Sequence, residues 1–200
     1  IWSIVQSGNS IFAGTERGVF ASSDSGSTWN PVGLDSLDTR ALAIYNGYLY
    51  AGTWGYGLFR TSLDSLKNWK LVNLGTANPA IHSLAVDPLN NALLAATFGA
   101  GLFRSEDGEV FTNINIGYAH IWTLGVTSAG VVYAGTYGAG LYTSPDGGIN
   151  WQRINGLSVK YIYSIAVDNN DNVFASSWNK GVFVKLNSGS GFISTGLTTE

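Results

Sequence analysis

Hydrophobic residues occur in short stretches along the whole chain, and turns rich in glycine separate these stretches. Four stretches form one unit, and no window has the 3.6-residue period of an amphipathic helix. The first stretch lies at 2–5, 41–44, 82–86, 122–126 and 163–167, and the second at 10–13, 48–51, 92–95, 131–134 and 172–175. The third begins at Gly18, Gly57, Gly101, Gly140 and Gly181, and the fourth follows Trp29, Trp69, Phe111, Trp151 and Phe192. This pattern predicts units of four short strands.

A short phrase marks the period of these units. It reads Ala-Gly-Thr at 13–15, 51–53 and 134–136, Ala-Ala-Thr at 95–97 and Ala-Ser-Ser at 175–177, so that it recurs every 38 to 44 residues. A period of about 40 residues with four strands is typical of propeller blades. The sequence therefore predicts an all-β fold, a single five-bladed β-propeller of four-stranded antiparallel blades at about 1–37, 38–79, 80–118, 119–159 and 160–200. The last and first repeats are in phase, which predicts that the two ends of the chain meet.

Acidic turns are expected between the third and fourth strands. The pattern Ser-x-Asp-x-Gly-x-x-Trp is complete at 22–29 and 144–151 and is altered at 62–69, 105–111 and 186–192. In such a turn the carboxylate accepts backbone N–H groups, glycine adopts a positive φ, and tryptophan packs beneath. We therefore interpret these residues as structural and not as a calcium loop, whose ligand spacing differs. They are Asp24, Gly26, Trp29, Asp64, Trp69, Asp107, Asp146, Gly148 and Trp151.

With these turns, the whole chain resembles the Asp-box (BNR) propeller superfamily. That group includes sialidases, xyloglucan-cleaving enzymes, sortilin-type receptors and photosystem assembly factors. The repeat sequences are most similar to those of uncharacterised secreted repeat proteins of bacteria. The resemblance implies Asp-box turns in every blade and an extracellular or periplasmic location.

Composition narrows the possible partners. The chain has a net charge of −3, with no basic cluster of the kind that binds nucleic acid. It has no apolar run of the length needed for membrane insertion. It lacks cysteine, and its two histidines do not have metal-ligand spacing. We therefore expect no cofactor and no metal, and either a glycan, a small-molecule ligand or a protein as partner.

The candidate site lies on the face opposite the acidic turns, where loops of the second and third strands meet loops between blades. Two sets of repeat positions there carry large or charged side chains, and we expect them to form two rings around the axis. The first set is Glu16, Arg17, Trp54, Phe98, Tyr137 and Trp178, and the second is Trp2, Arg40, His82, Trp122 and Tyr163. Flat aromatic surfaces with a few polar groups are typical of small-ligand sites. We call this set the aromatic bowl; the alternative is that its aromatics pack blade against blade.

Three functions fit these residues. The first is a non-catalytic module that binds a glycan or small polar ligand in the aromatic bowl, where the aromatics stack and Arg17, Arg40 and His82 donate hydrogen bonds. The second is a protein–protein interaction scaffold in which the same aromatics are hot spots. The third is a glycoside hydrolase of the sialidase or xyloglucanase type using Glu16. A glycosidase needs two facing carboxylates, and most acids of the chain lie in the turns of the other face, which favours binding without catalysis.

Overall fold

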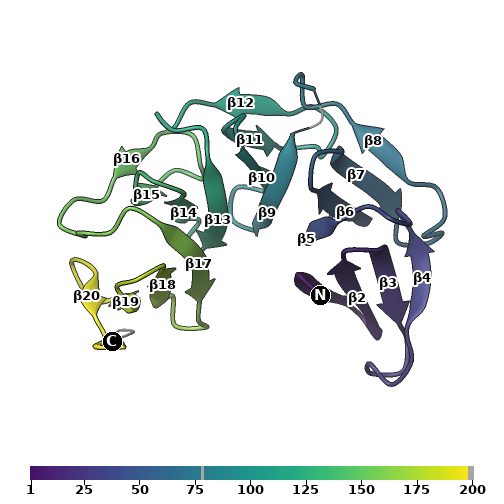
Figure 1. Ribbon diagram of the computed structural model, residues 1–200, viewed down its shortest axis with the longest axis horizontal. Coiled ribbons are helices and arrows are strands. Elements are labelled where there is room, and N and C mark those ends of the chain that lie inside the picture. The colour runs from purple at the N-terminus through teal and green to yellow at the C-terminus, as the bar shows by residue number, and fades with distance from the viewer. Residues whose placement is uncertain (78, 198–200) are drawn as a thin grey trace.

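The computed structural model describes residues 1–77 and 79–197, and these residues form antiparallel sheets and no helix (Figure 1). The first sheet contains β1 (Ser3–Ser7), β2 (Ser10–Thr15), β3 (Gly18–Ser22) and β4 (Asn30–Gly33). The second contains β5 (Thr39–Tyr45), β6 (Tyr48–Thr53), β7 (Gly57–Ser62) and β8 (Lys70–Val72). The third contains β9 (Ala80–Asp87), β10 (Ala92–Phe98), β11 (Leu102–Ser105) and β12 (Thr112–Ile114). The fourth contains β13 (Ile121–Val126), β14 (Val132–Thr136), β15 (Leu141–Ser144) and β16 (Gln152–Arg153), and the fifth β17 (Ile162–Val167), β18 (Val173–Ser177), β19 (Val182–Lys185) and β20 (Ile193–Ser194).

These five sheets are the blades of a β-propeller, which confirms the predicted all-β, five-bladed fold. Each sheet has its four strands in chain order, paired antiparallel, so that a blade is one continuous meander. The first strand of each blade lies toward the axis and the fourth lies at the periphery (Figure 1). Residue 78 of the second predicted blade and residues 198–200 of the fifth lie outside the described residues.

The ring of blades is open. In Figure 1 the first blade and the fifth blade stand apart, with β1 and β17 on opposite sides of the gap. The prediction that the ends of the chain meet is therefore wrong for the described residues. Counting residues gives the phase of the repeats along the chain, but the angle between adjacent blades depends on how their side chains pack.

Hydrophobic clusters join each blade to the next and set that packing. Four such clusters exist among the described residues, and each draws its members from two successive blades. In the cluster between the first two blades, for example, Phe12 packs with Leu42 and Leu49. Glycine at the second strand allows this close approach: a Cβ on Gly52 would overlap the side chain of Ile81 in the following blade.

Acidic turns close the outer hairpins of the first four blades, whereas the turn of the fifth blade has Asn187 and no acidic residue. Asp24 accepts hydrogen bonds from the backbone N–H of Thr28 at 2.8 Å and from the Ser22 hydroxyl at 2.8 Å. Gly26 adopts a φ of 89°, and its carbonyl accepts the indole N–H of Trp29 at 3.0 Å. The turn at 144–151 repeats this pattern, since Asp146 accepts hydrogen bonds from Ser144 and Asn150, and Trp151 donates to Gly148.

These hydrogen bonds also stabilise the charged form of the acids. The Thr28 backbone and side-chain donors, followed by Ser22, lower the pKa of Asp24 from 3.8 to about 2. The Ser144 hydroxyl and then the Asn150 backbone lower the pKa of Asp146 to about 2 as well. The second blade differs, because Leu66 occupies the glycine position with a φ of 49° and Trp69 donates to Val32 of the preceding blade at 2.8 Å. The same motif position therefore has two packing roles.

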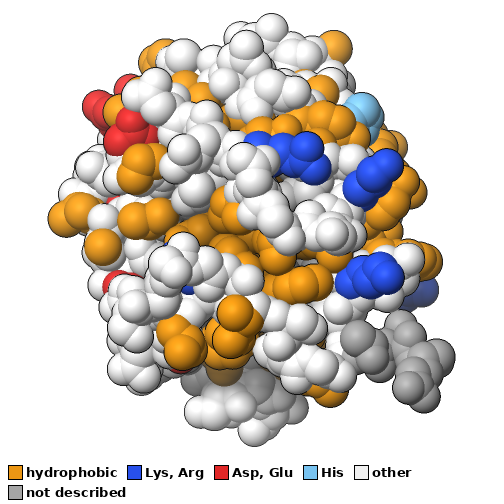
Figure 2. Space-filling model, turned by 90° about the vertical axis from the view of Figure 1, so that its left-hand side faces the viewer, with side chains coloured by type: hydrophobic (Ala, Val, Ile, Leu, Met, Phe, Trp, Pro, Cys, Tyr) orange, Lys and Arg blue, Asp and Glu red, His pale blue; other side chains and the backbone are white. Residues whose placement is uncertain are grey.

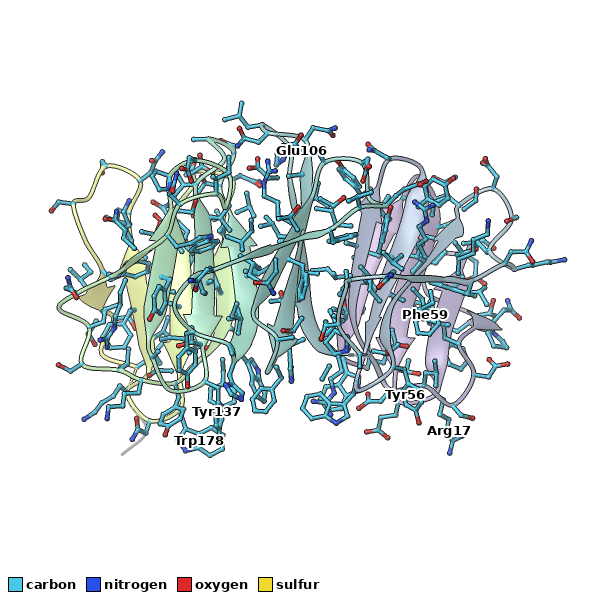
Figure 3. The ribbon with its side chains drawn as sticks, turned by 90° about the horizontal axis from the view of Figure 1, so that it is seen from above. Arg17, Tyr56, Phe59, Glu106, Tyr137 and Trp178 are labelled. Atoms are coloured by element: carbon cyan, nitrogen blue, oxygen red, sulfur yellow. The ribbon has the colours of Figure 1, made fainter. Side chains whose placement is uncertain are left out.

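The two faces of the propeller differ in chemistry. Figure 3 shows Arg17, Tyr56, Tyr137 and Trp178 on one face and Glu106 on the opposite face, which carries the acidic turns. From the side of the last blades, Lys, Arg and His side chains lie toward one edge and Asp and Glu toward the other, with hydrophobic side chains between them (Figure 2). In the part of the chain that is described, no helix is long and apolar enough to cross a membrane.

Candidate functional site

Short loops between the second and third strands carry the first set of site residues, and a hydroxyl group fixes each loop. The last residue of the Ala-Gly-Thr phrase donates to the carbonyl of the glycine at, or directly before, the start of the third strand, at 2.7–3.1 Å in all five blades. In every blade except the second the same hydroxyl also accepts a loop N–H at 3.0 Å. These hydroxyls belong to Thr15, Thr53, Thr97, Thr136 and Ser177.

Backbone hydrogen bonds tie these loops to the segments that lead into the next strands. The N–H of Trp54 donates to Asp38 at 2.8 Å, and the N–H of Tyr137 donates to His120 at 3.0 Å. Phe98 forms an antiparallel bridge with His120, and Tyr137 forms one with Tyr161, which links successive blades. The backbones of these loops are therefore held on both sides.

The aromatic side chains form one continuous network across this face. The Trp122 ring stacks on His82 at 4.1 Å between centroids and contacts Tyr163 at 5.0 Å. Trp54 meets His82 edge-on at 4.8 Å, and at the other end Tyr163 contacts Trp178 at 5.1 Å. Phe98 and Tyr137 join the network at 5.7 Å from each other. These geometries lie within the range of favourable aromatic pairs.

Much of this network is open to solvent. Trp2, Trp54, Tyr137 and Trp178 are exposed, and Trp178 retains 68% of its accessible surface. Phe98, Trp122, Tyr163 and His82 are partly buried. The prediction left open whether the aromatics pack blade against blade or face the solvent, and the structure has them do both: they contact one another across blades and leave part of their surface exposed.

Arg40 lies between two indole rings at the start of β5. Its guanidinium carbon is 4.1 Å from the ring centroid of Trp54 and 5.0 Å from that of Trp2, both within cation–π range. Its Nε and Nη2 atoms each lie 3.0 Å from Oδ2 of Asp38. The ion pair and the two rings together hold the guanidinium in one orientation.

His82 is a neutral base within the network. Burial, followed by the positive charge of Arg40, lowers the pKa of His82 from 6.5 to about 4, despite the opposing effect of Asp38. The imidazole is therefore uncharged at neutral pH. The Nε2 atom of His82 and the Oδ1 atom of Asp38 are both buried, and neither has a hydrogen-bond partner among the described residues.

A cavity of about 210 Å³ lies at the centre of this network. It receives side chains from the first strands of the second to fifth blades and from the residue before β1: Trp2, Arg40, His82, Ser83, Trp122, Thr123 and Tyr163. All five members of the second predicted set therefore meet in one place. No carboxylate lines the cavity within the described part of the chain.

A larger cavity of about 560 Å³ lies on the outer side of the third blade. Its charged groups already have partners: Arg104 pairs with Glu106 at 2.7 Å and donates to the carbonyl of Gly147, and Asp107 accepts hydrogen bonds from its own turn. It contains no aromatic side chain. We therefore take the smaller axial cavity as the candidate site, because its side chains converge from all blades.

Some predicted residues do not join this cavity. Glu16 and Arg17 are exposed on the same face, but they neither line the cavity nor take part in the aromatic contacts. Conversely, three residues of the site were not predicted from the sequence: Asp38, Ser83 and Thr123. Ser83 and Thr123 directly follow His82 and Trp122, so an inner-strand position next to a known site residue was the available signal. Among the described residues, no group of three or more potential metal ligands is present.

Comparison with known proteins supports the architecture. No protein-family model matches the chain, and no curated protein sequence is significantly similar to it. An ancestral GH74 enzyme is 23% identical with a TM-score of 0.79 over 97% of this chain, which spans 31% of that enzyme. YCF48 bound to D1 peptide is 20% identical with a TM-score of 0.71, over 96% of this chain and 66% of YCF48.

A third similar structure is the extracellular domain of a hybrid two-component system protein from B. thetaiotaomicron. It is 18% identical with a TM-score of 0.76, covering 100% of this chain and 28% of that domain. The chain thus spans about a third or less of the enzyme and the sensor domain. At these identities the likeness concerns the fold, and fold does not define activity. The chain has the architecture of a β-propeller.

Proposed function

We propose that this protein is a non-catalytic, ligand-binding propeller of the Asp-box type that holds a glycan or small polar ligand in its aromatic bowl. The observation that carries this proposal is the continuous aromatic network around the axial cavity, with Arg40 and His82 set into it. The hydrogen-bonding pattern at Asp24 and Asp146 supports the Asp-box assignment.

The chemistry of the bowl suits a sugar ring. Indole faces stack against the C–H groups of a pyranose, and a guanidinium held by two rings is a fixed donor for a hydroxyl or carboxylate oxygen. The hydroxyls of Ser83 and Thr123 also line the cavity; each already accepts a backbone N–H from the next blade, and its O–H group can still donate. Because the loops are already fixed, binding loses little loop entropy, which favours affinity.

A glycan array followed by tryptophan fluorescence titration tests the proposal. We expect Trp54→Ala and Trp178→Ala each to weaken binding at least tenfold, since losing an aromatic hot spot costs more than about 1.4 kcal/mol. Tyr56→Ala is the matched control, because Tyr56 is exposed in the same loop as Trp54 and has no contact in the aromatic network. Unchanged binding by both tryptophan variants would rule the bowl out as the site.

A protein-interaction scaffold is the second candidate. It is favoured by exposed indoles at the rim, which are common hot spots, and by the likeness to YCF48, a propeller captured with a peptide. Under this function, a stoichiometric protein partner binds and Trp178→Ala releases it, while the glycan array gives no signal.

Glycoside hydrolysis is the third candidate, and the likeness to a GH74 enzyme is its support. The exposed Glu16 lies outside the cavity, and among the described residues no carboxylate lines that cavity, whereas a glycosidase needs two facing ones. Turnover of a fluorogenic glycoside that is lost in Glu16→Gln would establish this function in place of binding alone.

We further propose an extracellular or periplasmic location. The likeness to extracellular sensor domains supports it. Fractionation of the native host, with an antibody against the chain, tests this location: recovery in the cytosol alone would contradict it.

A further inference from the structure

The first and last blades leave open the faces that the internal blades bury against one another. On the first blade, Ile4 is 59% exposed, whereas Leu42 and Leu124 at the same repeat position are 4% and 7% exposed. Ile11 on β2 is half-buried, but its equivalents in the four other blades are fully buried. Leu42, the equivalent of Ile4 in the second blade, packs against the first blade. The exposed side chains of the first blade therefore point toward the place that a preceding blade would occupy.

The fifth blade has the complementary opening. Phe174 is 36% exposed, whereas Phe12 and Tyr50 at the same position are 1% and 0% exposed. Val182 on β19 is half-buried, although its equivalents in the four other blades are buried. Side chains at this repeat position face the following blade. Tyr133 of the fourth blade contacts Phe192 of the fifth, and the Tyr50 hydroxyl of the second blade donates to the Gly108 carbonyl of the third.

A hydrogen bond between the inner strands of successive blades has the same direction each time: the later blade donates a backbone N–H to a hydroxyl of the preceding blade. Ser3 accepts the N–H of Leu42 at 3.1 Å, and Ser83 accepts that of Leu124 at 3.1 Å. Thr123 likewise accepts the N–H of Ile165 at 3.2 Å. In the fifth blade this position is Ser164, which is exposed on β17. The residue in the first blade equivalent to Leu42, Leu124 and Ile165 is Ile4, so a blade-five face and a blade-one face have matching hydrophobic and hydrogen-bonding groups.

We propose that the blade-five face of one copy binds the blade-one face of a second copy, head to tail. The new interface would repeat the hydrophobic packing of the four internal ones, with Phe174 against Ile4 and Ile11. It would also repeat the hydrogen bond found at three of them, with Ser164 accepting the N–H of Ile4. The internal interfaces hold the two faces of one copy apart (Figure 1), so in a solution of this 200-residue chain the available partner face is that of a second copy. Contacts of this heterologous kind close into a ring or extend, according to their rotation.

Sedimentation velocity over a range of protein concentrations tests the proposal. We expect the wild-type chain to associate reversibly, and Ile4→Asp or Phe174→Asp to raise its dissociation constant at least ~100-fold, because each buries an unpaired charge. Leu71→Asp is the control, since Leu71 is an exposed apolar residue on the outer strand β8, away from both faces. Both test positions are partly exposed in the monomer, and circular dichroism verifies that each variant is folded.

Mixing the two variants distinguishes a head-to-tail contact from any other. Ile4→Asp keeps an intact blade-five face, and Phe174→Asp keeps an intact blade-one face. The equimolar mixture should therefore form a one-to-one heterodimer and nothing larger, although each variant alone is monomeric. A wild-type chain that is monomeric at every concentration, or a mixture that fails to dimerise, would overturn the proposal.

Discussion

The hydroxyl that fixes each site loop leads to a quantitative prediction at Thr136. Its Oγ1 donates to the carbonyl of Gly140 at 2.7 Å and accepts the N–H of Ala139 at 3.0 Å, and the side chain is fully buried. Thr136→Val is nearly isosteric and removes both hydrogen bonds, each worth about 1 kcal/mol net. The additional buried methyl group returns up to about 0.8 kcal/mol. We expect a loss of about 1–2 kcal/mol in the free energy of unfolding.

Two measurements check this prediction. In thermal unfolding the midpoint should fall by roughly 2–8 °C for a chain of this size. In native-state hydrogen exchange the amide of Ala139 should lose protection about fivefold or more, because its acceptor is gone.

Thr136→Ser is the control for the hydrogen-exchange measurement. It keeps the hydroxyl, as Ser177 does in the fifth blade, where the same two hydrogen bonds are present. It removes a buried methyl group, so its stability also falls, but Ala139 should stay protected. If Ala139 exchanges at the wild-type rate in Thr136→Val, the hydroxyl does not fix the loop and the reasoning fails.

Three further predictions concern charge and packing. The pKa values of Asp24 and Asp146 lie near 2 in the folded chain against 3.8 for the unfolded reference, so their stabilisation is present above pH 3.8 and is lost as pH falls toward 2. The urea concentration at the unfolding midpoint should fall between pH 3.8 and pH 2, and it should fall less in the variant that carries both Asp24→Asn and Asp146→Asn. The pKa of His82 is about 4 in the folded chain, against 6.5 for the unfolded reference, so the unfolded chain takes up a proton first and stability declines as pH falls from 6.5 to 4. NMR titration of the imidazole should give a midpoint near 4. His82→Gln should remove this part of the pH dependence of stability. Finally, Phe12→Ala should lower the free energy of unfolding in urea by about 3–5 kcal/mol. Phe174→Ala should lower it distinctly less when the chain is monomeric, because only Phe12 has a following blade to pack against. Equal losses would contradict this packing.

Much of the fold could be predicted because its signals are local. Strand pairing within a blade depends on short hydrophobic stretches joined by turns, and the Thr hydroxyl, the positive-φ glycine and the acidic turn each leave a mark at fixed spacing. The opening of the ring could not be predicted, because it depends on small angles summed over four interfaces. Trp69 shows the same limit, since it has the motif position of Trp29 but donates to the neighbouring blade.

The candidate site was predictable where blades are equivalent. Topology assigns each loop to a face, and repeat alignment then places Trp122 and Tyr163 near the same axis. The contacts within the site depend on side-chain conformations that have no repeat counterpart. The position of Arg40 between two indoles and its pairing with Asp38 is such a case, because no other blade has an arginine there.

The hydrogen-bonded hydroxyls determine how freely this surface can change. Each hydroxyl secures its loop through backbone carbonyls and amides, so the identity of the next residue does not affect the anchoring. The five blades already carry glutamate, tryptophan, phenylalanine, tyrosine and tryptophan at that next position. Saturation mutagenesis confined to these positions would sample many recognition surfaces on an unaltered framework, which makes the chain a candidate scaffold for selecting new binders.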